Sequence, residues 1–265
     1  MHQAFDIIAN QYDELFTYSA IGIAQRNLVW GYLEKLLAHR NELNILELNC
    51  GTGEDALWFA RKGHKILATD ISNNMLQITK EKISNAGLIN NVKIIQADIS
   101  EIETAGINEK FDLIFSNFGG INCISSDELI KLSSDIKNLL KAAGQLVMVI
   151  MPEFCAWETL YFILKFNFKK AFRRLSAKGE VVKFNGENLI TYYYSVARIK
   201  KSFGQNFNLV AVKPIGFFIP PSYMEKFFHS KPKFFNILKK LEHSISKFDF
   251  LAGFSDHFLI NLQVK

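Results

Sequence analysis

The sequence has few of the features that mark a secreted or membrane-spanning protein. Its 265 residues include only three cysteines, Cys50, Cys123 and Cys155, and no CxxC pair. An odd number of widely spaced cysteines predicts free thiols in a reducing compartment, with no disulfide framework and no metal site. No run of about 18 uncharged apolar residues occurs, so we expect no transmembrane helix. The N-terminus lacks the basic start of a secretory signal, and a cytoplasmic location is expected.

The charge and the aromatic residues are unevenly distributed along the chain. The net charge is +5, and apolar residues make up 49% of the sequence. The stretch 160–201 contains ten Lys or Arg and two Glu, and the stretch 213–247 contains seven Lys and two Glu. Of the 24 phenylalanines, 18 lie from Phe154 onward. The sequence therefore combines an acidic first part with a basic, phenylalanine-rich second part.

The stretch 44–55, NILELNCGTGED, predicts a strand, a tight turn and a helix. Glycine at Gly51 and Gly53 allows the backbone to approach a ligand closely, and the start of a helix offers unpaired N–H groups. Asp70 ends the next apolar run, where a carboxylate can accept hydrogen bonds from both hydroxyls of a ribose. The pattern predicts a nucleoside-type cofactor at the carboxyl edge of a parallel sheet, although a glycine turn without a ligand would look similar.

An acid in the first strand helps to choose the cofactor. Glu47 would repel an anionic pyrophosphate but not a cationic sulfonium compound. The stretch resembles motif I of the class I S-adenosylmethionine-dependent methyltransferases, acid-x-Gly-x-Gly-x-Gly. Asn49 stands where that family usually has its first glycine, and asparagine tolerates left-handed backbone best among the other residues. The resemblance implies S-adenosylmethionine as cofactor and S-adenosylhomocysteine as product.

Later motifs extend the resemblance. The phrase DISNNML, residues 70–76, is similar to the family's D-[I/V]-S-x-x-M-L, and the N-terminal FDIIANQYD is similar to F-D-x-x-A-x-x-Y-D of small-molecule methyltransferases. The second phrase implies a segment that covers the cofactor pocket; a helix packed on the sheet is the alternative. The cofactor-binding residues implied are Tyr12, Glu47, Asn49, Gly51, Gly53, Asp70 on the ribose, Ile71 and Met75 beside the adenine, Asp98 and Ile99 at the adenine edge, and Asn117 near the methyl group.

The predicted fold class is α/β. Strand patterns at 44–48, 65–69, 92–96, 111–120 (a strand and its exit) and 145–151 alternate with helical patterns, which favours an open parallel sheet with helices on both faces. The resemblance adds a seven-stranded Rossmann-like sheet, mostly parallel, with a sixth strand at 207–212 and an antiparallel last strand at 258–264. We predict a single methyltransferase domain, 1–265, made of N-terminal helices (1–40), a cofactor-binding core (41–151) and lid insertions over the active site (152–194 and 214–256).

The lid insertions carry no assignable motif. We expect a helix at 157–175, a β-hairpin at 180–194 with a type I′ turn at Asn185-Gly186, and basic helices up to Lys247, which together make an apolar pocket with a basic rim. His257, with an unperturbed pKa of about 6.5, is a candidate general base, and Tyr223 and Tyr193 are further catalytic candidates. Ordinary packing would also explain all three.

The function expected is methyl transfer from S-adenosylmethionine to a hydrophobic small molecule, with oxygen the preferred acceptor. Methylation of an acyl group on an acidic carrier protein, N- or C-methylation, and an inactive cofactor-binding scaffold are the alternatives. Nucleic acid is disfavoured because Asn117 is followed by Phe118-Gly119 and not by the Pro-Pro-aromatic motif of base methylation. The basic lid is a solvated face, a membrane contact or a carrier dock. The sequence does not fix the oligomeric state.

Overall fold

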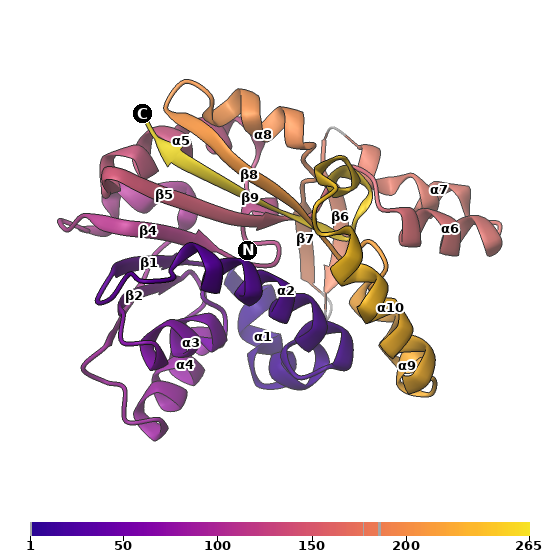
Figure 1. Cartoon of the computed structure of the whole chain (residues 1–265), viewed down its shortest axis with the longest axis horizontal. Helices are drawn as coiled ribbons and strands as arrows, with labels where there is room; N and C mark the ends of the chain where they lie inside the picture. Colours follow the sequence, from indigo (N-terminus) through magenta and orange to yellow (C-terminus); the bar gives the residue numbers. More distant parts are fainter. Residues whose placement is uncertain (1, 177, 185–186) are drawn as a thin grey trace.

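A seven-stranded sheet forms the centre of the computed structural model, which describes residues 2–176, 178–184 and 187–265 (Figure 1). The strand order is β3-β2-β1-β4-β5-β9-β8. Strand β9 runs antiparallel to both of its neighbours, and the other pairs are parallel, which confirms the predicted Rossmann-like sheet. The strands are β1 (Asn44–Leu48), β2 (Lys65–Asp70), β3 (Val92–Gln96), β4 (Phe111–Ser116), β5 (Leu140–Ile150), β8 (Phe207–Ile215) and β9 (His257–Val264).

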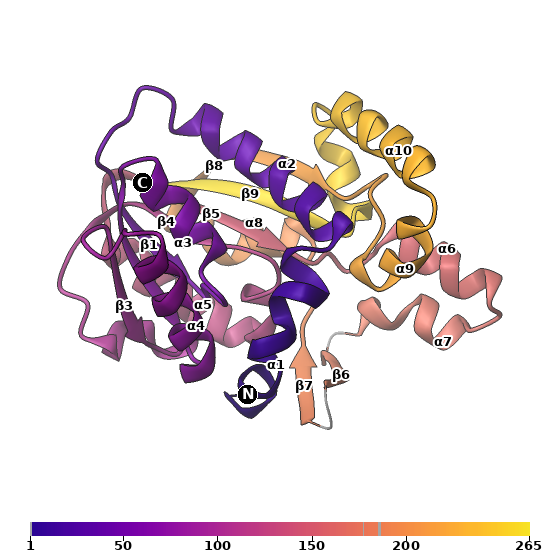
Figure 2. The same cartoon turned by 90° about the horizontal axis from the view of Figure 1, so that it is seen from below.

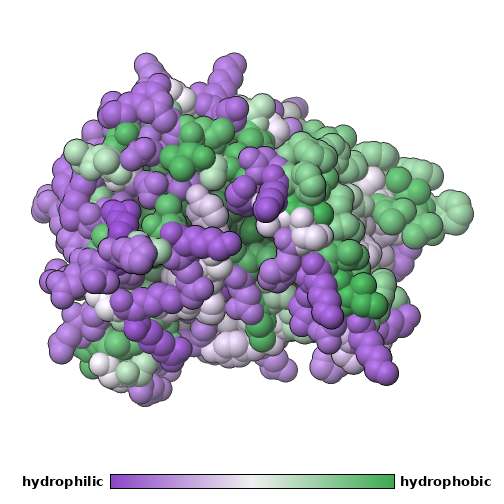
Figure 3. Space-filling model, viewed as in Figure 1, coloured by the Kyte–Doolittle hydropathy of each residue, from purple (hydrophilic) through white to green (hydrophobic). Residues whose placement is uncertain are grey.

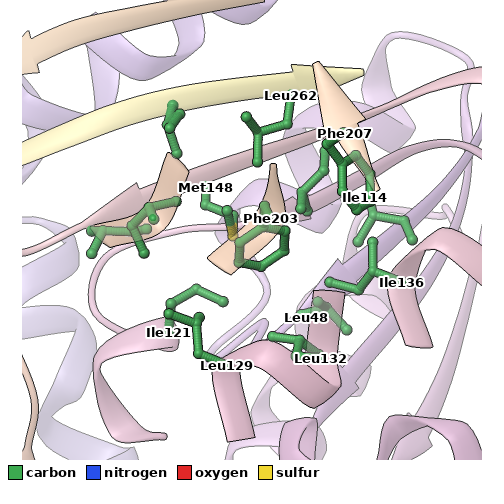
Figure 4. Packing of buried hydrophobic residues seen from close by; sticks show 14 of the residues in the cluster. Leu48, Ile114, Ile121, Leu129, Leu132, Ile136, Met148, Phe203, Phe207 and Leu262 are labelled. Carbon is green, nitrogen blue, oxygen red and sulfur yellow. The ribbon is translucent and has the colours of Figure 1, made fainter. Parts of the chain in front are cut away.

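Helices cover both faces of the sheet because successive strand residues point to opposite sides. Ile45 packs with the helices of one face and Leu46 with those of the other. Figure 4 shows the second of these clusters, in which strand residues such as Leu48 and Ile114 meet Phe203. One face carries α2 (Ala20–Leu36), α3 (Glu54–Arg61) and α4 (Asn73–Asn85); the other carries η2 (Ile99–Ala105), α5 (Ser126–Leu139) and α8 (Val196–Phe203).

Short polar residues start the helices that border the site. The Ser72 side chain accepts a hydrogen bond from the Met75 N–H and caps α4, as predicted, and Ser195 caps α8. Gly87 ends the α4 turn with φ 70°, which confirms its expected C-terminal role.

The N-terminal segment lies across the carboxyl edge of the sheet. Helix α1 (His2–Tyr12) continues into a π-helical turn, η1 (Asp13–Thr17), and contacts β7 (Figure 2). Two carboxylates fasten the segment. Asp6 accepts a 2.5 Å hydrogen bond from Ser72 Oγ, and Asp13 accepts one of 2.5 Å from Thr52 Oγ1. The segment thus covers the glycine turn.

The lid elements gather at one end of the sheet, on the right in Figure 1. The predicted helix at 157–175 is wrong in its continuity, because Phe166 adopts φ 55° and separates two short helices. The hairpin is confirmed but shorter, because Tyr192, Tyr193 and Tyr194 lie beyond its second strand; its turn, Asn185-Gly186, lies outside the described residues. The lid consists of α6 (Ala156–Leu164), α7 (Phe168–Ala171), η4 (Arg173–Leu175), β6 (Glu180–Phe184), β7 (Glu187–Thr191), η5 (Ser222–Met224), α9 (Glu225–His229), α10 (Pro232–Ile245) and η6 (Asp249–Phe254).

One further boundary differs from the prediction. A turn was expected before a fifth strand at 145–151, but β5 begins at Leu140, which pairs with Phe111 across a register shift. Ala143, with φ 59°, makes an irregularity inside the strand. A short 3-10 turn, η3 (Ile121–Cys123), follows β4. The three cysteines are free and buried. Across the described ranges, no helix combines the length and apolar character needed to span a bilayer.

Candidate active site

A cavity of about 340 Å³ lies at the carboxyl ends of β1, β2 and β4, within the size range of small-molecule sites. The N-terminal segment and the glycine turn form one side, and the lid and the start of β9 form the other. The same cavity therefore joins the predicted cofactor region to the predicted acceptor region.

The glycine turn leaves space where a side chain would intrude. Asn49, Gly51 and Gly53 all have left-handed backbone, with φ of 56°, 55° and 80°. A Cβ on Gly53 would lie 2.5 Å from Thr79 Cγ2, so glycine is required for the packing of α3 against α4. A Cβ on Gly51 would meet only Tyr12, at 4.0 Å. Asn49 thus takes the backbone conformation expected of it in place of glycine.

Asp70 ties the end of β2 to this turn. Its carboxylate accepts hydrogen bonds from the Gly51 N–H and the Ser72 N–H, both 2.9 Å long. Burial raises the pKa of Asp70, and these backbone hydrogen bonds oppose the rise. The carboxylate lines the cavity with acceptor capacity left, which fits a ribose.

Asp55 and Arg26 make a polar group under the β4 exit. Asp55 accepts hydrogen bonds from Trp30 Nε1 at 2.6 Å and from Asn117 Nδ2 at 3.0 Å. Arg26 Nε lies 3.8 Å from Asp55, and both Nε and Nη1 of Arg26 are buried with no hydrogen-bond partner among the residues that the structure describes. A buried guanidinium with free donors beside a cavity fits a ligand carboxylate, such as that of an amino-acid cofactor.

Glu47 is buried in β1, behind the cavity wall. Burial raises its pKa well above the ordinary value; Asp55 adds to the rise and Arg26 opposes it. Its Oε2 has no hydrogen-bond partner. A cation bound nearby would therefore favour the ionised carboxylate.

On the acceptor side, two arginines join the lid to β9. Glu158 accepts hydrogen bonds from Arg173 Nε at 2.8 Å and from Arg174 Nη2 at 3.1 Å. Arg174 Nη2 also donates to Asp256 Oδ1 at 2.9 Å. Arg174 was expected beside the basic helix face and is instead buried, because two carboxylates hold it inside. These ion pairs fix the wall of the cavity.

His257 follows Asp256 at the start of β9. The two side chains lie 3.2 Å apart, from His257 Nδ1 to Asp256 Oδ2, but Nδ1 makes no hydrogen bond within the described ranges. Asp256 Oδ2 accepts a hydrogen bond from Gln25 Nε2. Burial acts to raise the pKa of Asp256, but His257 and Arg174 outweigh it and hold the pKa below its ordinary value. The negatively charged Asp256 therefore lies directly beside the His257 ring. The His257 ring also packs edge-on against Phe118, at 5.3 Å between centroids.

The structure brings most of the predicted site residues to the cavity. Tyr12, Asn49, Gly51, Asp70, Ile71, Met75, Asn117, Tyr193, Tyr223 and His257 line it. Four do not. Glu47 and Gly53 lie behind its wall, Ile99 is in the core, and the Asp98 carboxylate caps η2 through the Ser100 N–H. The binding roles of all these residues remain predictions.

Sequence reasoning missed Arg26 and Asp256. Arg26 lies within the periodic apolar pattern of α2. For Asp256, the only local signal was the Asp-His pair at 256–257. Both residues are recognised only by their contacts with residues from other elements.

The sequence is similar to those of known methyltransferases. The family model of a methyltransferase domain matches residues 45–144. The chain is 26% identical over 202 residues to the ubiquinone/menaquinone biosynthesis C-methyltransferase UbiE of Francisella tularensis, covering 74% of each chain. It is 28% identical over 193 residues to the protein of the same name from Edwardsiella ictaluri, covering 70% of this chain and 71% of that relative.

Solved structures share the fold. The CcbJ methyltransferase of Streptomyces caelestis superposes with a TM-score of 0.62 at 16% identity, covering 98% of this chain and 97% of that one. Magnesium protoporphyrin IX methyltransferase from Synechocystis, with bound S-adenosylhomocysteine, gives 0.59 at 14% identity, covering 92% and 85%. Residues 45–144 thus match a methyltransferase domain, and the whole chain has the fold of S-adenosylmethionine-dependent methyltransferases. It is an enzyme, and S-adenosylmethionine is its cofactor.

Proposed function

We propose that this enzyme methylates a ring carbon of a hydrophobic, hydroxylated small molecule of the quinol type, with His257 as general base. The main support is the Asp256–His257 pair, whose side chains lie 3.2 Å apart. The pair is on the lid side of the cavity that the predicted cofactor-binding residues line. We place this activity in the cytoplasm, where buried cysteines stay reduced.

The acceptor chemistry needs a proton to leave. When bound, the cofactor supplies an electrophilic methyl group on a positively charged sulfur. A neutral hydroxylated ring becomes strongly nucleophilic when its hydroxyl is deprotonated, because the charge spreads to the adjacent ring carbon. His257 Nε2 would accept the hydroxyl proton, and Asp256 would stabilise the resulting imidazolium. The methyl group would leave the sulfur as the carbon–methyl bond forms, and the proton on that ring carbon would then be lost to water while the ring oxygen is protonated again, which restores the hydroxylated aromatic ring.

The same deprotonation would also serve oxygen methylation, which the sequence favoured. Similarity to C-methyltransferases supports carbon instead. The protein's contribution is otherwise to align the reactants and exclude water. The Phe118 ring beside His257 and the covering N-terminal segment support that role.

Several residues of this chain would bind the cofactor. Asp70 would hold the ribose, and the unpartnered donors of Arg26 would bind the cofactor carboxylate. Ile71 and Met75 would pack against the adenine.

The test supplies quinols with short apolar tails and isotope-labelled S-adenosylmethionine to the purified enzyme, and locates the label by NMR. We expect a new carbon–methyl bond. His257→Ala should lower kcat about 100-fold or more without weakening S-adenosylhomocysteine binding. The loss should shrink as pH rises, because the quinol then ionises without help. His243→Ala, at an exposed histidine on α10, should leave kcat unchanged.

Two outcomes would contradict the proposal. Label found only on oxygen would reject carbon methylation, and an active His257→Ala variant would reject the assigned base. Cofactor binding by calorimetry without methyl transfer to any acceptor would instead favour the inactive cofactor-binding scaffold.

A further inference from the structure

The outer face of the lid exposes many large apolar side chains. On α6 and α7 they include Leu164, Phe166 and Phe168, and on α9, α10 and η6 they include Phe227, Phe234 and Phe250. Phe166 is 85% exposed, and Phe250 and Leu164 are each 71% exposed. Figure 3 shows hydrophobic atoms over this end of the molecule. We call these six residues and the lysines between them the lid face. Contiguous apolar patches of this kind mark interaction sites.

Phe166 takes an unfavourable backbone conformation to reach this position. Its φ of 55° lies in the left-handed region, which bulky side chains avoid. The backbone N–H of Phe166 donates a hydrogen bond to the Ile163 carbonyl. Its ring points into solvent at the bend between α6 and α7. Strained residues of this kind occur where function requires them.

The exposed charge of the lid face is almost entirely positive. Exposed lysines lie between the apolar residues in both lid segments, among them Lys165, Lys169, Lys170, Lys226, Lys231 and Lys233.

The acids of α6, α9, α10 and η6 are turned inward or paired. Glu158 binds the two arginines, Glu225 accepts hydrogen bonds from the N–H groups of α2, and Glu242 accepts four from backbone N–H groups of 216–219. Asp249 pairs with Lys213. The lysines of the lid face therefore keep their positive field toward solvent.

The two lid segments make one continuous surface. Trp157 of α6 packs edge-on against Phe228 of α9 at 5.8 Å between ring centroids, and Tyr161 lies 5.8 Å from Tyr223. Tyr223 is partly exposed and also lines the cavity. Tyr223 thus connects the surface of the lid to the cavity.

We propose that the lid face docks on an anionic lipid bilayer. Protruding phenylalanines enter the boundary between head groups and acyl chains, and lysines beside them are attracted to anionic head groups. A second copy of the chain is a poor partner, because a symmetric contact would bring lysines against lysines with no free acid to pair them. An acidic protein would satisfy the lysines, but a bilayer accepts both the lysines and the scattered, protruding rings.

Docking would place the cavity against the source of an apolar acceptor. This consequence rests on the proposed function, since it assumes that the acceptor is lipid-soluble. The docking itself does not depend on catalysis and is measured without substrate.

The experiment is co-sedimentation of the full-length enzyme with vesicles of phosphatidylglycerol mixed with phosphatidylcholine, compared with phosphatidylcholine alone. We expect binding to the anionic vesicles that weakens as salt rises, because salt screens the lysines. Phe166→Ser with Phe168→Ser should weaken binding about tenfold or more, and Lys169→Glu with Lys233→Glu similarly.

Matched controls change the same kinds of residue outside the lid. Ile89→Ser with Ile130→Ser removes two exposed apolar residues, and Lys80→Glu with Lys93→Glu reverses two exposed lysines. Both should bind vesicles like the wild type. All variants should retain S-adenosylhomocysteine binding, which shows that they are folded.

The proposal is overturned if the wild type does not bind anionic vesicles or if the lid variants bind them as well as the control variants do. Dimerisation lost in the lid variants without vesicle binding would assign the face to a second copy. Capture of an acidic carrier protein without vesicle binding would assign it to the carrier. Methyl transfer that fails while vesicle binding holds would reject the proposed function alone.

Discussion

Glu47 shows how a single residue can connect cofactor charge to proton release. Its carboxyl is buried, its pKa is raised well above the ordinary value, and one oxygen has no hydrogen-bond partner. S-adenosylmethionine carries a positive sulfur and its product does not. A residue whose ionisation responds to that charge can distinguish the two.

We therefore predict that Glu47→Gln weakens S-adenosylmethionine binding by about tenfold and S-adenosylhomocysteine binding much less. In the wild type, the cation favours the ionised carboxylate, so binding releases a proton and affinity rises with pH until the free enzyme's carboxyl is ionised. Calorimetry in two buffers of different ionisation enthalpy measures the proton. Equal losses for both ligands would show that Glu47 is only structural.

At this scale the sequence predicted residues that belong to a contiguous pattern. Asp70 ends an apolar run and Asn49 precedes a glycine turn, so their places followed from local order. Arg26 could not be found in this way, because its significance depends on Asp55, Asn117 and Phe118, which arrive from other elements. The burial of Arg174 could not be predicted, because nothing in its own segment reveals the buried Asp256.

Among the elements, those of the lid are held together by a cluster of buried charges. Arg174 is buried between Glu158 and Asp256, and the pKa of Glu158 is lowered because the hydrogen bond from Arg173 and the charge of Arg174 outweigh the effect of burial. The hydrophobic periodicity suggested one long helix here. Two short helices form because the chain turns at Phe166, which lets Arg173 and Arg174 reach inward.

Glu158→Gln should destabilise the enzyme by about 3 kcal/mol, because it leaves Arg174 buried with less compensating charge. Acid should have a related effect on the wild type. The pKa values of Glu158 and Asp256 are lowered on folding, so their stabilisation is present above the ordinary carboxyl range and is lost as pH falls through the lowered values.

Urea unfolding followed by circular dichroism across acid pH checks both effects. The variant should lose less stability between neutral and acid pH than the wild type. Glu109→Gln, at an exposed acid with no ion pair among the described contacts, provides the control. A parallel pH dependence of the two proteins would contradict the assignment.

Over the whole molecule, the last strand ties the C-terminal part of the chain to the central sheet. Strand β9 pairs with β5 on one side and β8 on the other, and Leu259 and Ile260 are fully buried. The core of 41–151 is therefore incomplete without residues from the C-terminus.

We predict one calorimetric unfolding transition for the full chain. S-adenosylhomocysteine should raise its midpoint, because the ligand binds the folded state alone. Differential scanning calorimetry with and without ligand measures this. Two resolved transitions, with only one of them shifted by ligand, would show that the lid and the core are separate domains.

The pairing of Ile215 with His257 gives the second lid segment an unusual freedom. Residues 216–256 leave the sheet and return to it at neighbouring backbone positions, so they form the loop of a very large hairpin. Each doubling of such a loop costs only about 0.6 kcal/mol in closure entropy. The segment can therefore be lengthened, shortened or exchanged while the strand that positions His257 stays in register. New acceptor specificities can arise in this fold by changing a loop, with the methyl-donor half of the enzyme inherited intact.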